Sequence, residues 1–231
     1  WDNPVAMRLV LNLAVAAAIV ASTYYAIVRI AEEKAEALAG GGTFALDGSH
    51  PAERDALEAL SRTLRGWREH ELASSLEELQ ASGRLRVAPR LTGGRSAVYV
   101  NALGLVSRVY LRGDELVVRS LPFPEIDVPE EARRTFATIR LAGTLFHELQ
   151  HADGIEDEGT AYEREMEFYE RLGERNAERL EGEDRRWFEW AVASALESAA
   201  AARASTKKRS AKLRSGFSAA LRAPTGRGFR S

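Results

Sequence analysis

Five consecutive residues in the second half of the 231-residue chain have types and spacing that suit a metal ion: His147, Glu148, Leu149, Gln150 and His151. On an α-helix, residues i and i+4 lie one above the other, so the two imidazoles can direct nitrogens at one ion. Glu148 lies one position round the helix, where its carboxylate is placed to take a proton from a metal-bound water. The pattern therefore predicts a Zn²⁺ site with Glu148 as catalytic base.

Apolar residues surround this motif: Leu141, Ala142, Leu145, Phe146 and Leu149. A polar trio inside such a run needs hydrogen-bond partners or a metal, because an unpaired buried polar group is costly. The alternative is a surface helix that carries two histidines by chance. The apolar neighbours favour the metal site.

Two histidines do not complete a catalytic zinc site, which uses three protein ligands and an open water position. The chain contains no cysteine, which excludes thiolate ligands, a disulfide framework and a cysteine nucleophile. The other histidines, His50 and His70, stand far upstream and are expected on the surface. The third ligand is therefore expected to be a carboxylate that follows His151.

Three acidic residues, Glu156, Asp157 and Glu158, follow the motif closely. Glu158 precedes Ala161 by three positions and Tyr162 by four, and these two residues begin the apolar stripe of the next expected helix. Glu158 is therefore expected to point inward. The predicted metal ligands are His147, His151 and Glu158.

The motif, together with Glu-Gly-Thr-Ala-Tyr at 158–162, resembles the gluzincin pattern of HExxH zinc metallopeptidases (zincins), in which a Glu on the next helix completes the site. The resemblance covers about residues 141–172 and implies a minimal gluzincin that hydrolyses peptide or protein substrates. Two features depart from that pattern. The connection from the motif to the Glu is much shorter than in large gluzincins, and Tyr162 stands where some families carry an Asp that orients a zinc-bound His.

A second spacing, His-Glu-x-x-His-x-x-Gly-x-x-Asp from His147 to Asp157, resembles the metzincin pattern, in which Gly154 would let the chain turn back to the metal. Metzincins also carry a Met-containing turn, whereas Met166 lies inside an expected amphipathic helix. The third ligand thus stays open between Glu158, which we favour, and Asp157.

The zincin resemblance also implies a mechanism, in which Glu148 accepts a proton as a zinc-activated water attacks a peptide carbonyl. Zincins pair substrate with an edge strand, for which residues 116–119 are the candidate. Tyr162 or Tyr169 is a candidate donor to the developing oxyanion, with core packing as the alternative for both. Glu163 is expected beside the ligands or in solvent.

Hydrophobic periodicity predicts an α+β fold, in which a short antiparallel sheet packs on the motif helix and further helices follow. The expected helices span about 52–64, 71–80, 128–151, a segment from 158, and 187–204, which begins with the aromatic cluster Trp187, Phe188 and Trp190. The expected strands span 85–87, 97–100, 105–111 and 116–119. Residues 112–115 are expected to form a hairpin turn, and Asp127 with Glu130 a capping box.

Residues 9–28 contain no charged side chain and are long enough to cross a bilayer as a helix. Arg8 and Arg29 bracket this run, and Tyr24 and Tyr25 stand where an interfacial aromatic belt is expected. A signal peptide and a buried core helix are the alternatives. We expect a single-pass membrane anchor with the catalytic domain on the extracytoplasmic side.

The expected domain organisation has four parts. Residues 1–30 form the anchor, 31–48 a stalk and Gly-rich linker, 49–204 the zincin-like domain, and 205–231 a basic tail. The tail has no acidic residue from Lys207 to Arg230 and is expected to be disordered and solvated. Contact with anionic lipid is the next expectation, and nucleic acid a distant third.

The overall composition, with 45% hydrophobic and 29% charged residues and a formal net charge of -2, is that of ordinary globular protein and indicates no particular partner. The alternative to a peptidase is a membrane-anchored binding or assembly subunit whose zinc site is structural or inactive. Either protein could be a subunit of a larger membrane assembly.

Overall fold

A computed structural model describes residues 4–40, 42–45, 50–89, 91, 96–102, 104–116 and 128–221. The fold is α+β, as expected, and divides into two compact units. The first, which we call the sheet unit, comprises Trp1–Arg65 and His70–Ser120. The second, the three-helix unit, comprises Gly66–Glu69 and Leu121–Ser231. The expected domain at 49–204 therefore contributes residues to both units.

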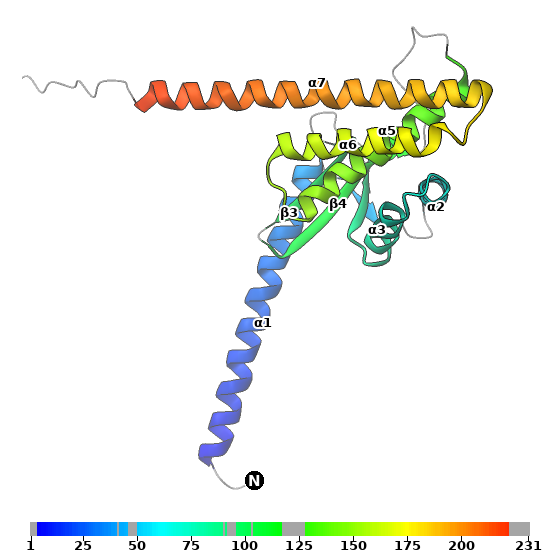
Figure 1. Cartoon of the computed structure of the whole chain (residues 1–231). Coiled ribbons are helices and arrows are strands. Elements are labelled where there is room, and N and C mark those ends of the chain that lie inside the picture. Colours follow the sequence, from blue (N-terminus) through cyan, green and yellow to red (C-terminus); the bar gives the residue numbers. More distant parts are fainter. Residues whose placement is uncertain are drawn as a thin grey trace, which may run out of the picture. The chain divides into compact units, whose positions relative to one another are not determined.

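Helix α1, Pro4–Ala39, opens the sheet unit and runs without a break through the expected anchor (Figure 1). Within the described residues, α1 is the helix that is long and apolar enough to cross a membrane. Large apolar side chains lie exposed along it, which is not the pattern of a buried core helix. These exposed residues are Leu13, Val15, Ile19, Val20, Tyr24, Tyr25, Ile27 and Ile30.

A four-stranded mixed sheet forms the centre of the sheet unit. Its strands are β1 (Phe44–Ala45), β2 (Leu85–Ala88), β3 (Ala97–Ala102) and β4 (Val106–Arg112), in the order β1-β2-β4-β3. The expected antiparallel pairing holds for the hairpin of β3 and β4, but β2 pairs with β4 in parallel, with Leu85 opposite Val109. The expectation of a wholly antiparallel sheet was wrong because β3 lies outside β4 instead of between β2 and β4.

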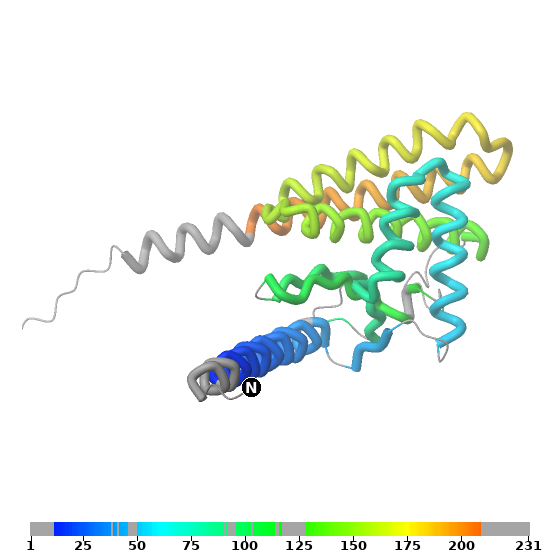
Figure 2. Tube along the Cα trace, turned by 90° about the horizontal axis from the view of Figure 1, so that it is seen from below, coloured from blue at the N-terminus to red at the C-terminus, as the bar shows by residue number. Residues whose placement is uncertain are grey.

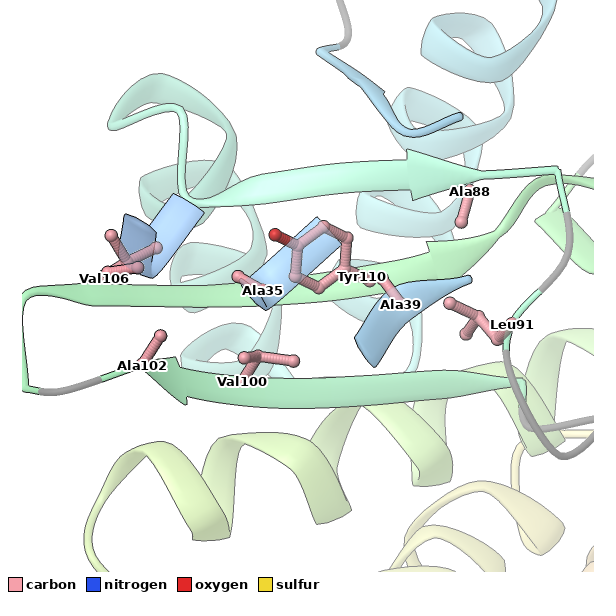
Figure 3. Close-up of a cluster of buried hydrophobic side chains, with 9 residues drawn as sticks. Ala35, Ala39, Ala88, Leu91, Val100, Ala102, Val106 and Tyr110 are labelled. Carbon is pink, nitrogen blue, oxygen red and sulfur yellow. The ribbon is translucent and has the colours of Figure 1, made fainter. Parts of the chain in front are cut away.

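The last turns of α1 pack on this sheet. Ala31, Ala35 and Ala39 repeat every four residues, so they share one helix face, and all three are fully buried. Their small side chains let the helix lie close to β3 and β4, where Figure 3 shows Ala35 and Ala39 beside Val100 and Tyr110. Residues 31–39, expected as part of a stalk, are thus a packed part of the unit.

Helices α2 (Pro51–Gly66) and α3 (His70–Ala81) complete the sheet unit and lie side by side in Figure 2. Proline at the first position of α2 is favourable because its missing N–H needs no partner there. The Glu77 carboxylate of α3 accepts hydrogen bonds from Ser61 at 2.6 Å and Arg65 at 2.7 Å. Both helices match the expected segments to within a few residues.

Two local expectations near the end of the sheet were wrong. Residues 113–116, expected as part of a hairpin turn and the start of a strand, form the short helix α4 (Gly113–Leu116). The remainder of the expected edge strand, 117–119, lies outside the described residues. The motif helix begins at Glu130 with Pro129 at its N-cap instead of at Val128, and Asp127 of the expected capping box is also outside the described residues.

The three-helix unit consists of α5 (Glu130–Ala152), α6 (Glu158–Ala177) and α7 (Gly182–Leu221), and Figures 1 and 2 show α6 and α7 side by side. The aromatic cluster at the start of α7 packs inside the unit. Phe188 is buried and meets Trp67 edge-on with ring centroids 5.7 Å apart, and Trp190 lies 5.6 Å from Phe136. These contacts give the cluster a role in packing the unit.

Helix α7 continues well beyond the expected end at residue 204. Residues 205–221, expected to be disordered, belong to this helix, and residues 222–231 lie outside the described part of the chain. The sequence Ala-Ala-Ala-Ala-Arg-Ala at 199–204 leads into a segment rich in Lys and Arg, and Ala, Lys and Arg are good helix formers. A high charge density therefore did not prevent helix formation here.

Candidate metal centre

The turn between α5 and α6 brings the residues after the motif back towards the two histidines. Gly154 has φ +94°, a left-handed conformation that side chains rarely adopt, and it ends α5 as expected. The N–H of Ile155 donates to the carbonyl of Gln150 at 3.0 Å, and the N–H of Gly154 to that of His151 at 3.1 Å. The chain is thereby reversed within a few residues, so α6 starts beside the motif.

Asp157 and Glu158, the two candidates for the third ligand, have different roles in this turn. Asp157 is the N-cap of α6, and its Oδ2 accepts hydrogen bonds from the Thr160 N–H at 2.7 Å and the Thr160 hydroxyl at 2.8 Å. These bonds, from the hydroxyl and then the N–H, lower the pKa of the Asp157 carboxyl. Glu158 instead turns its carboxylate to the histidines.

Three ligand atoms converge on one point: Nε2 of His147, Nε2 of His151 and Oε2 of Glu158. The two nitrogens are 3.2 Å apart, and the Glu158 oxygen lies 3.3 Å from that of His147 and 3.7 Å from that of His151. Ligands at about 2.0–2.2 Å from a tetrahedral ion lie about 3.4 Å from one another. This group can therefore hold a metal ion as one triangular face of a tetrahedron.

The other ring nitrogen of each histidine, Nδ1, lies beside an oxygen atom of the protein. Nδ1 of His151 lies 2.6 Å from the carbonyl oxygen of Ile155, an acceptor that requires the proton on Nδ1. Nδ1 of His147 lies 3.1 Å from Oε2 of Glu165. Such partners hold metal-ligating histidines in the correct tautomer and orientation.

Glu165 is a functional candidate that the sequence analysis missed. It is 6% exposed, and the hydroxyl of Tyr169 donates to its Oε1 at 2.9 Å. Glu163, which was expected near the ligands or in solvent, forms an ion pair with Arg203. A signal for Glu165 existed: it lies seven positions after Glu158, two turns along the same helix face, among apolar residues. An acidic residue within an apolar stripe indicates a buried partner.

The ring of Tyr169 packs against α5 at Gly143, where the missing side chain leaves room for it. An ideal Cβ at Gly143 would lie 2.0 Å from the Tyr169 oxygen, so the ring occupies the space that any other residue would need. The Tyr169 side chain is buried, and burial, followed by the charge of Glu165, raises the pKa of its hydroxyl. Because that hydroxyl is committed to Glu165, Tyr169 supports the site from behind and is not an oxyanion donor.

Replacing Gly143 by Ala is expected to destabilise the protein by about 1–3 kcal/mol, because the ring of Tyr169 must move out of a packed position. Urea unfolding of the full chain in detergent, followed by tryptophan fluorescence, measures this effect. Gly66→Ala is the control, since an added Cβ there meets nothing within 4 Å. Equal unfolding free energies for the two variants would contradict the role assigned to Gly143.

Replacing Glu165 by Gln is expected to lower the metal affinity about 10–100-fold, because the partner that orients His147 loses its charge. Competition with a chromophoric chelator measures this affinity. Glu163→Gln is the matched control on the same helix, because its carboxylate pairs with Arg203 and contacts no histidine in the group. Equal metal affinities for the two variants would exclude Glu165 as a positioning residue.

The electrostatics of the group are those of a site that binds a cation. Burial by itself would lower the pKa of the His147 imidazole, but its contacts with Glu158 and Glu165 outweigh burial and raise that pKa to about 9. The contact with Glu158 is also the main cause that raises the pKa of His151. His147, followed by His151, holds the pKa of the Glu158 carboxyl well below its ordinary value. Without metal, the imidazole of His147 is therefore protonated at neutral pH.

Metal binding is therefore expected to compete with protons. The raised pKa of His147 makes its protonated form stabilising, so the metal-free protein should lose this stability as pH rises from 6.5 through about 9. Over the same range the apparent affinity for zinc should rise, because one proton fewer must be displaced. Urea unfolding with a chelator and zinc titration at several pH values test both trends. The His147→Gln variant should lack the first trend, and a flat stability profile in the parent chain would contradict it.

The remaining predicted site residues lie as follows. Glu148 is buried on α5, and its charge is among those that raise the pKa of both histidines. The Tyr162 ring lies beside His147 with centroids 4.4 Å apart. His50 and His70 belong to the sheet unit, where His50 stacks on Phe44.

Comparison with protein-family models, curated proteins and solved structures finds no match for this chain.

Proposed function

We propose that this protein is a membrane-anchored zinc metallopeptidase in which His147, His151 and Glu158 hold the metal and Glu148 is the general base. The convergence of the three ligand atoms, with edges of 3.2, 3.3 and 3.7 Å, carries this proposal. Two imidazoles and one carboxylate are a donor set typical of catalytic zinc. The side chain of Glu158 is 42% exposed, which supports a site that substrate can reach.

In this proposal each residue has one task. Bound zinc supplies a water of lowered pKa and polarises the substrate carbonyl. The carboxylate of Glu148 accepts a proton from the attacking water and passes it to the amine that leaves. The Glu165 carboxylate lies beside Nδ1 of His147 and favours its positive charge, and the Ile155 carbonyl accepts the Nδ1 proton of His151. Tyr162, whose ring lies beside that of His147, is the candidate donor to the developing oxyanion.

The test is made on the full chain purified in detergent. Mass spectrometry of the metal should give about one zinc per chain, and cleavage of a mixed peptide library should stop with a chelator and return with added zinc. A well-folded protein that binds no zinc from solution would overturn the proposal. Zinc binding without cleavage of any peptide would contradict the proposed peptidase activity but agree with the proposed metal ligands.

A further inference from the structure

The anchor helix and the sheet have a defined register. Ala35 and Ala39 lie along β4 in the order in which the strand runs, with Val106 at one end and Leu91 at the other (Figure 3). Arg108 of β4 donates to Oε1 of Glu32 at 2.7 Å, and the Arg108 side chain is 15% exposed. This half-buried ion pair places Arg108 beside Glu32, and the order of Ala35 and Ala39 along β4 shows that α1 and β4 run side by side in the same direction (Figure 3).

The turn between β3 and β4 lies at the end of the sheet from which the apolar part of α1 departs (Figure 1). Gly104, with φ +69°, makes this turn, and its N–H donates to Oδ1 of Asn101 at 3.1 Å. Leu105 follows and is 42% exposed. A single exposed leucine is ordinary on a protein surface, so its position decides whether it has a role.

That position follows from the register. Leu105 precedes Arg108 by three residues, about 10 Å of strand. Ten ångströms along α1 correspond to about six or seven residues, which sets Leu105 level with residues 25–26. These residues lie inside the uncharged run 9–28, whose twenty residues span about 30 Å, the thickness of a bilayer core. Arg29, the first charged residue after the run, is then further from the bilayer centre than Leu105.

Helix α1 has no break at this boundary. It continues from the apolar run into the segment that packs on the sheet, so the sheet unit cannot move away from the membrane on a flexible linker. Small alanines at 31, 35 and 39 and the Glu32 pair with Arg108 hold the two elements together. The end of the sheet that carries Leu105 is thereby held at a fixed height against the bilayer.

We propose that the β3–β4 turn is a second membrane contact, in which Leu105 inserts into the lipid bilayer at the boundary of the apolar core and the headgroups. This inference rests on the proposed membrane anchor and is independent of metal binding and catalysis. It follows that the sheet unit lies directly on the membrane surface. The partner is the bilayer that α1 crosses.

The absence of cysteine allows a direct test by spin labelling of the full chain in phosphatidylcholine vesicles. Single cysteines replace Leu105, Ile19 in the middle of the apolar run, and Glu36, an exposed residue of α1 beyond it. Each nitroxide is measured for collisions with oxygen, which concentrates in lipid, and with a water-soluble nickel complex. The label at Ile19 should favour oxygen and that at Glu36 nickel. The label at Leu105 should favour oxygen, with a smaller ratio than at Ile19.

Three outcomes separate the possibilities. An oxygen-favouring label at Leu105 supports the second contact. A label at Leu105 that behaves like Glu36, while Ile19 stays in lipid, overturns the second contact and leaves the anchor. A label at Ile19 that is reached by nickel overturns the anchor and this inference with it. The Leu105→Cys chain is checked for folding by circular dichroism and urea unfolding, which are compared with those of the unlabelled parent chain.

Discussion

Replacing Glu148 by Gln is expected to lower peptide hydrolysis by roughly 10²–10⁴-fold while the zinc content of the protein stays the same. The amide keeps the shape and the burial of the side chain but cannot accept a proton from the attacking water. Glu148 is not one of the three converging ligands, so the metal site should survive. Steady-state cleavage of a peptide substrate, with metal measured on the same sample, tests both parts.

The matched control is Glu156→Gln, which removes one negative charge from an exposed residue of the turn after the motif. Its hydrolysis rate should remain within a few-fold of the parent chain. If Glu148→Gln and Glu156→Gln behave alike, Glu148 is not the base. Full biological function with Glu148→Gln would favour the alternative, a membrane-anchored binding or assembly subunit with a structural zinc site.

Replacing Glu158 by Gln is expected to abolish stoichiometric zinc binding, whereas Asp157→Asn should leave it intact. Glu158 supplies the carboxylate oxygen of the three converging ligand atoms. Changing a residue that only positions a ligand lowers metal affinity about 10–100-fold, and loss of a ligand itself should lower it further. The carboxylate of Asp157 caps α6, a position at which Asn serves about as well. Each of the two variants removes one negative charge, at adjacent positions. A difference in zinc binding between them therefore reports the loss of a ligand and not the change in net charge.

Equilibrium dialysis followed by metal analysis measures both variants, with urea unfolding to show that each one folds. The metzincin-like alternative predicts the reverse result, with zinc lost in Asp157→Asn and retained in Glu158→Gln. Zinc loss in both variants would show that charge near the motif matters more than a particular ligand. Asp157→Ala, which removes the cap altogether, should cost about 0.5–2 kcal/mol of stability without loss of the metal.

Local sequence rules predicted most of the helices. The five residues 147–151 required an α-helix to bring two imidazoles together, and α5 supplies it. Gly154 predicted the end of that helix, because the left-handed backbone conformation that often ends a helix strongly favours glycine. The apolar run 9–28 predicted a long helix, and α1 contains it. Each of these inferences depends on neighbours a few positions apart, which a sequence displays directly.

Non-local pairings were predicted poorly. The parallel pairing of β2 with β4 depends on strands 24 residues apart, Leu85 with Val109, and no local pattern specifies it. The docking of α1 on the sheet was missed because Ala31, Ala35 and Ala39 look like any alanines in a helix until a surface is placed against them.

One local expectation also failed. The helical structure of residues 205–221 was missed because their charge was taken to indicate disorder.

For the candidate site, the sequence by itself determined the pair of histidines, Glu148 beside them, and a short list of acidic residues that could complete the group. Helical periodicity also favoured Glu158 over Asp157. Only the tertiary structure showed how these neighbours divide their tasks, because Asp157 bonds to Thr160 in its own turn while Glu158 meets side chains on another helix. The contacts of Glu165 with His147 and of Tyr169 with Gly143 also join α5 to α6, so the sequence could only hint at Glu165 through its place in the apolar stripe of α6.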